Sequence, residues 1–137
     1  MECRILTIED AGLLKHFVDD QRTQYNEEQI AIFLQQEHAV GFVGVEEEKI
    51  IGFAIGYKMI KPDGRKAFYL HAIDVMEQYQ RKGFGTVIMT YIRNRVKEMG
   101  CDKMFLITNK ENEAACKCYE KAGGEGKPVV LYEFAEK

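Results

Sequence analysis

The sequence lacks the features that mark membrane-embedded, secreted and nucleic-acid-binding proteins. Its longest apolar-plus-glycine stretches, such as residues 50–57, are far shorter than the roughly 20 residues of a membrane span. The chain begins without an apolar run of signal-peptide length. It carries 19 Lys and Arg against 22 Asp and Glu, with no basic block of the kind that binds nucleic acid. We therefore expect a cytoplasmic protein with neither a membrane nor a nucleic-acid partner.

Cysteine and histidine are scarce, and their spacing does not suit a metal. None of the four cysteines forms a C-x-x-C pair, and Cys116 and Cys118 lie two apart on a predicted helix, where such residues do not face each other. The three histidines are scattered along the chain. We expect no zinc site and four reduced, buried thiols.

The residues that are present are typical of one folded domain spanning 1–137. Hydrophobic residues make up 46% of the chain and charged residues 30%, which are ordinary globular values. A chain of this length buries roughly two thirds of its unfolded surface, which is enough for one core.

Hydrophobic periodicity and turn residues predict an ordered series of strands and helices. Asp10, Asn26 and Asn112 are expected at helix starts, and Gly100 at a helix end. Gly52 and Gly56, inside a long predicted strand, indicate a bulge or a surface that approaches the backbone. The predicted strands are 3–8, 38–45, 50–60, 67–75, 103–108 and 129–134, and the predicted helices are 11–19, 27–36, 84–99 and 112–122.

The order of these elements is β-α-α-β-β-β-α-β-α-β. The first half contains antiparallel hairpins, and β-α-β units follow. This order predicts an α/β (α+β) fold, with one twisted mixed sheet flanked by helices.

The segment 75–86, which joins a predicted strand to a predicted helix, is the most informative part of the chain. Gly83 and Gly85 allow a tight turn and the close approach of a ligand to the main chain. The free amides and the dipole of the helix start favour an anion, and Arg81 and Lys82 add two positive charges. The segment predicts a phosphate or pyrophosphate site, with a plain tight turn carrying two exposed cations as the alternative.

The spacing of this segment matches one known family. Neither the P-loop nor the dinucleotide fingerprint fits, but Gln80-x-x-Gly83-x-Gly85 resembles the acetyl-CoA signature of the GNAT N-acetyltransferases, Q/R-x-x-G-x-G/A. Residues 109–124 are similar to the family's next helix, N-x-x-A-x-x-x-Y-x-x-x-G, through Asn112 and Tyr119. The resemblance covers most of the chain and implies an acyltransferase of the GNAT fold that uses acetyl-CoA.

Within the family, the chain most resembles aminoglycoside 3-N-acetyltransferase-like members. This likeness rests on residues 51–61, 68–75 and 130–134. The chain departs from that group at Ala72, where its members usually carry an acidic residue, and Asp74 lies two positions later.

The resemblance also implies roles for individual residues. The backbone of Ile73 and Val75 would bind the pantetheine arm, and the amides of the following loop would hold the pyrophosphate. Tyr119 would act as the general acid towards the departing thiolate. The implied acetyl-CoA-binding set is Ile73, Val75, Gln80, Arg81, Lys82, Gly83, Phe84, Gly85, Thr86, Asn112 and Tyr119. From the residues alone, Asn112 could merely cap a helix and Tyr119 could pack on the sheet.

Direct attack by an amine on the thioester requires the neutral amine, so a base is expected near strand 67–75. His71 has a pKa suited to this task, and Asp74 is a second candidate. Strict alternation along the strand places His71 on the side of Tyr69 and Ile73, and Asp74 on the opposite side with Ala72, unless a bulge intervenes.

These observations predict an acetyl-CoA-dependent N-acetyltransferase acting on a small, cationic, aminoglycoside-like amine. Transfer to a protein N-terminus or lysine is the first alternative, and a CoA-binding sensor without catalysis is the second. A domain that binds ATP with the same loop is the third. The terminal strand and the exposed apolar faces also leave room for a homodimer.

Overall fold

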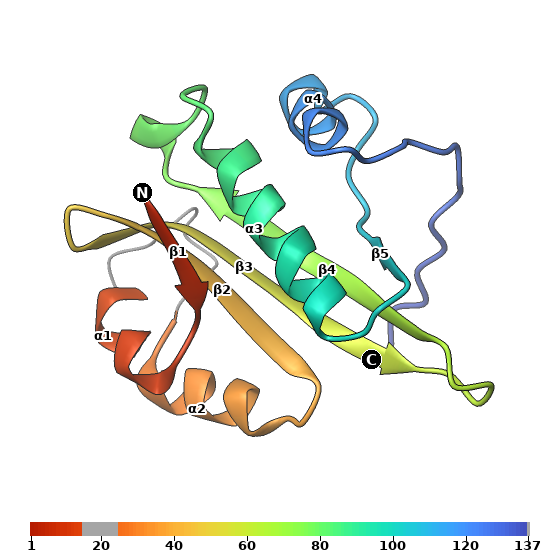
Figure 1. The fold of residues 1–137 in the computed structure, drawn as a ribbon, viewed down its shortest axis with the longest axis horizontal. Coiled ribbons are helices and arrows are strands. Elements are labelled where there is room, and N and C mark those ends of the chain that lie inside the picture. The colour runs from red at the N-terminus through yellow and green to blue at the C-terminus, as the bar shows by residue number, and fades with distance from the viewer. Residues whose placement is uncertain (15–24, 137) are drawn as a thin grey trace.

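The computed structural model describes residues 1–14 and 25–136. Its elements largely follow the predicted order (Figure 1). Residues 15–19 of the predicted first helix lie outside the described residues. The elements are β1 (Glu2–Ile5), η1 (Ile8–Asp10), α1 (Ala11–Leu14), α2 (Glu27–Gln35), β2 (Ala39–Glu46), β3 (Lys49–Ile60), β4 (Lys66–Val75), η2 (Glu77–Tyr79), α3 (Phe84–Glu98), β5 (Lys103–Phe105) and α4 (Glu113–Lys121).

The five strands form one mixed sheet in the order β1-β2-β3-β4-β5. The first four strands pair antiparallel, and β5 pairs parallel with β4. The turn between β2 and β3 is tight, because Glu47 and Glu48 both adopt positive φ, at 49° and 65°. The α/β fold class and the mixed sheet flanked by helices are thus confirmed.

Each face of the sheet carries its own hydrophobic cluster. On one face α3 buries Ile88, Met89, Ile92 and Val96 against strand residues that include Phe42 and Phe68. The spacing of these helix residues is the period expected of one helical face. On the other face α1 and α2 bury Leu14 and Ile30 with Val43 and Phe53.

The two strand glycines act as their sequence context predicted. A Cβ on Gly52 would collide with the side chain of Ile88, and one on Gly56 would collide with the ring of Phe68. Gly56 also lies at a register shift between β3 and β4. These glycines therefore let α3 and an aromatic ring lie directly on the sheet.

Three local expectations were wrong or incomplete. Residues 129–134 form no strand; they are extended and exposed, with Val129 at 78% and Phe134 at 84%. Asp10 is not the N-cap of a helix, because it is the last residue of η1. Its carboxylate accepts hydrogen bonds from the Arg4 guanidinium and from the Thr7 backbone N–H. The four free thiols are half-buried rather than buried. In the ranges that are described, no helix is long and apolar enough to cross a membrane.

Candidate active site

The turn that follows β4 is tied to the strand by one side chain. The Gln80 amide donates a hydrogen bond of 2.8 Å to the carbonyl oxygen of Val75. Between them, η2 turns the chain through one short helical segment. Gln80 therefore sets the path by which the chain passes from the end of β4 to the start of α3.

The first turn of α3 leaves its backbone amides without a side-chain partner. The other two longer helices are capped, α2 by Asn26 and α4 by Asn112, whose side-chain oxygens each accept a backbone N–H. The N-cap of α3 is Gly83, which has no side chain to offer and a φ of 86°. The first turn of α3 contains no acidic residue. Free amides at the positive end of a helix dipole favour an anion, so this helix start suits the predicted phosphate site.

Two cations border this helix start. Arg81 and Lys82 are both exposed, and Arg81 itself adopts a positive φ of 63°. The Lys82 ammonium lies 5.9 Å from the centroid of the Tyr79 ring, which in turn contacts Phe84 edge-on. The sequence did not single out Tyr79, whose ring supports Lys82 beside the loop.

Gly85 has a different role from the one the spacing suggested. A Cβ at this position would lie 3.1 Å from the Cys118 sulfur on α4. The neighbouring Thr86 hydroxyl also points to that sulfur, at 3.9 Å. Gly85 therefore allows the start of α3 to approach α4, whereas the space beside Gly83 is open.

A register shift interrupts β4 in its middle. Gly56 faces Leu70 but Ile55 faces Ala72, so His71 is an extra residue with no opposite partner. Beyond this point Ile73 packs into the same cluster as Phe68 and Leu70. Strict alternation, which would put Ile73 on the side of His71, therefore does not hold, because the bulge that the expectation allowed for is present and reverses the phase.

The same shift places Asp74 on the face of the sheet from which Tyr69 projects. Tyr69 faces Tyr57 and Asp74 faces Phe53, and these partners are four residues apart on β3. Tyr69 and Asp74 therefore project from the same face of the sheet, the one covered by α1 and α2. Asp74 does share its side with Ala72, as expected, but that side is not opposite to Tyr69.

His71 is exposed and held by its neighbour. The Tyr69 hydroxyl and His71 Nδ1 are 3.1 Å apart, within hydrogen-bond distance. The Tyr69 ring stacks on Phe105 of β5, with centroids 5.1 Å apart. These contacts fix the imidazole at the point where β4 and β5 cease to pair, since their pairing ends at Tyr69 and Phe105.

Tyr119 on α4 is half-buried, and its phenol has a shifted pKa. Burial raises the pKa of its phenol above the ordinary tyrosine value. Nearby Asp74 and the thiols of Cys116 and Cys118 raise that pKa further. The phenol is therefore protonated at neutral pH and lies close enough to Asp74 to feel its charge.

Asn112 performs the local role that was left open. Its side-chain oxygen accepts the Ala115 amide at 3.2 Å and caps α4. Its part in ligand binding remains a prediction. Tyr119 packs at the edge of the α3 cluster. Because it is only partly buried there, this packing is compatible with the predicted role of its hydroxyl.

Comparisons with known proteins bear on the family and the fold of the chain. The profile of the acetyltransferase (GNAT) family matches residues 11–124. An N-alpha-acetyltransferase of Sulfurisphaera tokodaii is 25% identical over an alignment of 111 positions, which covers 75% of this chain and 66% of that relative. This chain therefore spans slightly less than two thirds of that relative's length.

Two solved structures share the fold over nearly the whole chain. An aminoglycoside acetyltransferase from an uncultured soil metagenomic sample, meta-AAC0020 with trehalose, has a TM-score of 0.86 at 20% identity and covers 99% of this chain and 96% of its own. The aminoglycoside N-acetyltransferase AAC(6')-Iy in complex with CoA has a TM-score of 0.76 at 19% identity, covering 98% and 99%. The expected enzyme class, an N-acetyltransferase, agrees with these matches. The chain belongs to the acetyltransferase (GNAT) family.

Proposed function

We propose that the protein transfers the acetyl group of acetyl-CoA to a primary amine of a small, cationic acceptor. The observation that carries this proposal is the start of α3, where the helix amides have no side-chain cap and no acidic neighbour in the first turn. A site of that kind favours a diphosphate.

The residues of the turn suit the donor. The amides of residues 81–86 would hold the pyrophosphate, with Arg81 and Lys82 adding positive charge and Gln80 keeping the loop tied to β4. A pantetheine arm would continue along the backbone of Ile73 and Val75. Bound acetyl-CoA would supply an acetyl group already activated as a thioester.

Tyr119 supplies the proton in this proposal. Its raised pKa keeps the phenol protonated, so the O–H can donate to the sulfur that departs. A thiol with an ordinary pKa near 8.5 leaves as a thiolate, which such a hydrogen bond stabilises.

Activation of the acceptor falls to the α1–α2 face of β4. An amine with a lysine-like pKa of about 10.4 must lose a proton at a cost of about 4.6 kcal/mol at pH 7. Asp74 and His71 are the candidate bases. Asp74 is favoured because its charge is felt at Tyr119, whereas the His71 ring is held by Tyr69.

The net charge and the similar proteins bear on the acceptor class. The net charge of −3 suits a cationic acceptor. The two aminoglycoside acetyltransferases share the fold, but the curated relative is named for a protein N-terminus. Transfer to an N-terminal amine is therefore the second candidate.

Release of free thiol from acetyl-CoA tests these alternatives directly. The panel contains aminoglycosides, small polyamines, and peptides with a free or blocked N-terminus. Turnover with an aminoglycoside or a polyamine supports the proposal, and turnover restricted to free-N-terminus peptides replaces it with the second candidate. Binding of CoA with no turnover of any amine would leave a sensor, and competition by ATP without thioester consumption would indicate a nucleotide-binding domain.

A further inference from the structure

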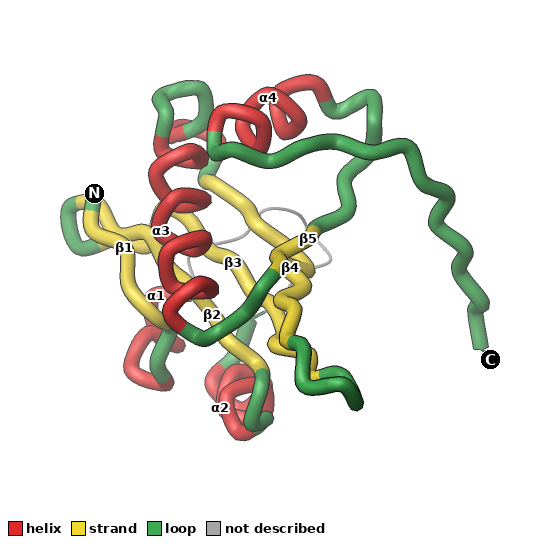
Figure 2. The backbone as a smooth tube through the Cα atoms, turned by 45° about the vertical axis from the view of Figure 1, so that its right-hand side comes forward, coloured by secondary structure: helices red, strands yellow, loops and turns green. Residues whose placement is uncertain are grey.

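Helix α4, which carries Tyr119, has few anchors to the rest of the molecule. Across its described residues 113–121 it has no fully buried side chain. A cavity of about 690 Å³ lies between its last turn and residues 104–108, and Tyr119 lines this cavity. Figure 2 shows the chain after α4 running outward, away from the sheet. The orientation of α4 therefore depends on a small number of contacts.

The first of these contacts lies within α4, at Cys118. Its sulfur lies 3.9 Å from the hydroxyl oxygen of Thr86, and the missing side chain of Gly85 allows this approach. The contact holds α4 against the start of α3. A helix held at one point can still rotate about that point, so Cys118 alone does not fix the direction of a neighbouring side chain.

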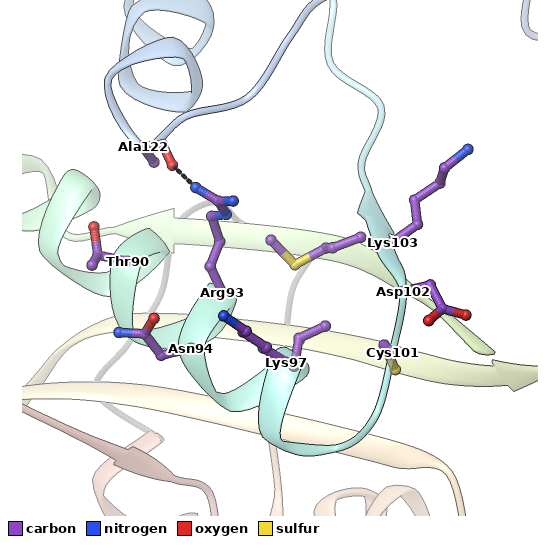
Figure 3. Close-up of a pocket in the computed structure, with 10 residues that line it drawn as sticks. Thr90, Arg93, Asn94, Lys97, Cys101, Asp102, Lys103 and Ala122 are labelled. Carbon is purple, nitrogen blue, oxygen red and sulfur yellow. Dashed lines mark hydrogen bonds between the residues drawn. The ribbon is translucent and has the colours of Figure 1, made fainter. Parts of the chain in front are cut away.

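The second contact lies just beyond the end of α4 and comes from Arg93 on α3. The guanidinium of Arg93 donates a hydrogen bond to the carbonyl oxygen of Ala122, as Figure 3 shows. Arg93 keeps its charge at any working pH, and a cation is favourable at the negative end of a helix dipole. Ala122 is 8% exposed, so water competes little for this charge-assisted bond.

The end of α4 is shaped to admit this guanidinium. A Cβ on Gly123, where φ is 96°, would collide with the side chain of Arg93. The Gly123 amide donates to the Glu120 carbonyl at 3.0 Å, and the Gly124 amide donates to the Tyr119 carbonyl at 2.9 Å. These two bonds form the Schellman motif that closes a helix. Tyr119 therefore begins the closing turn that Arg93 holds at its other end.

The bond between Arg93 and Ala122 also stands between two cavities. Both residues line the larger cavity, which Tyr119 shares, and a second one of about 450 Å³ between α3 and residues 101–104. With a cavity on either side, few side chains support the closing turn of α4. Loss of the bond should therefore allow this turn to shift.

We infer that Arg93 is a positioning residue for Tyr119: by holding the Ala122 carbonyl, it fixes the last turn of α4 and the direction in which the Tyr119 hydroxyl points. Cys118 and Ala122 are fixed to α3, and Tyr119 lies between them in the chain. The expected effect on rate rests on the proposed function, whereas the placement of the phenol does not.

Nuclear magnetic resonance of the chain with ¹³C-labelled tyrosine tests the placement without any acetyl transfer. The Tyr119 signal is assigned by its loss in Tyr119→Phe. Arg93→Met keeps most of the apolar stem and removes the donor, so the Tyr119 signal should shift and be broadened more by a soluble nitroxide. Lys97→Met removes a neighbouring cation of α3 that lines only the smaller of these two cavities, and should leave the signal unchanged. An unchanged Tyr119 signal in Arg93→Met overturns the inference.

Kinetics test whether the placement matters for the proposed reaction. A misplaced catalytic group can cost up to about 100-fold in rate, and we expect Arg93→Met to lower kcat by about 10- to 100-fold. The affinity for CoA should stay within about twofold, because the start of α3 is untouched. Arg93→Lys keeps a cation that can donate to the same single carbonyl, so its kcat should lie within about threefold of the wild type.

The outcomes separate this inference from the proposed function. A loss of CoA affinity that matches the loss of kcat in Arg93→Met overturns the inference, because Arg93 would then act on the donor. Arg93→Lys as slow as Arg93→Met overturns it as well. A wild type that transfers no acetyl group contradicts the proposed function, and the Tyr119 signal alone then decides whether Arg93 positions the phenol.

Discussion

At the scale of single residues, Tyr119 is the side chain on which the proposed chemistry depends most. Replacing it with Phe removes the proton donor and preserves the ring that packs beside the α3 cluster. Loss of a general acid typically costs 10²–10⁴-fold in rate. We expect Tyr119→Phe to lower kcat by about 100-fold while the affinity for CoA, measured by calorimetry, changes less than threefold.

The pH profile separates acid catalysis from packing. Because burial raises the pKa of Tyr119, the phenol stays protonated up to pH values above about 10. Deprotonation of Tyr119 should therefore not lower kcat below that pH. Tyr91 of α3 is the matched control, since burial also raises its pKa and its ring contacts Phe42 of β2. Tyr91→Phe should leave kcat unchanged. Equal rates for Tyr119→Phe and the wild type would remove Tyr119 from the chemistry.

At the scale of elements, the start of α3 can be tested with a pair of glycines. Gly83 and Gly64 have nearly the same φ, 86° and 87°, and open space where a Cβ would lie. Valine at either position is strained by about 1–2 kcal/mol. We expect both Gly83→Val and Gly64→Val to lower the free energy of unfolding by a similar amount, measured by urea denaturation.

Only the helix-start variant should lose the ligand. Calorimetry should show at least a tenfold weaker affinity for CoA in Gly83→Val, because its side chain blocks the approach of the diphosphate to the amides. Gly64→Val, in the turn between β3 and β4, should bind CoA as the wild type does. Unchanged affinity in Gly83→Val would contradict the proposed site.

The elements also show what the sequence can and cannot predict. Helix α3 follows from its periodic apolar residues, and the caps Asn26 and Asn112 follow from residue type, since these are local properties. Gly56 indicated a bulge, but that His71 would be the extra residue was not predictable, because it depends on which residues of β3 and β4 lie opposite each other. The apolar pattern of 129–134 is strand-like, but pairing requires an edge that the pattern does not specify.

The site was predictable to a similar extent. The spacing of Gln80 and Gly83 located the turn, and the structure gives Gln80 a bond to Val75 that the spacing could not show. The contact of Gly85 with Cys118 joins two helices far apart in sequence, so no local pattern reports it. The approach of Asp74 to Tyr119 is tertiary in the same way.

At the scale of the whole molecule, one sheet serves two separate hydrophobic clusters. Ile92 of α3 is fully buried on one face, and Ile30 of α2 is buried on the other. Neighbouring residues of a strand alternate between the clusters, as Phe42 and Val43 do on β2. Loss of either cluster therefore removes packing contacts from strands on which the other cluster also packs. We expect the two faces to unfold together.

Truncation of one isoleucine on each face tests this coupling. Ile92→Ala and Ile30→Ala should each lower the free energy of unfolding by about 2–5 kcal/mol, because each leaves a cavity in a packed cluster. Ile60→Ala, at a residue 53% exposed at the end of β3, should cost less than about 0.5 kcal/mol. In each variant, urea unfolding followed by circular dichroism and by tyrosine fluorescence should give one coincident transition. Two separated transitions in Ile30→Ala would mean that the α1–α2 face melts while α3 stays on the sheet, and the shared-sheet account would then be wrong.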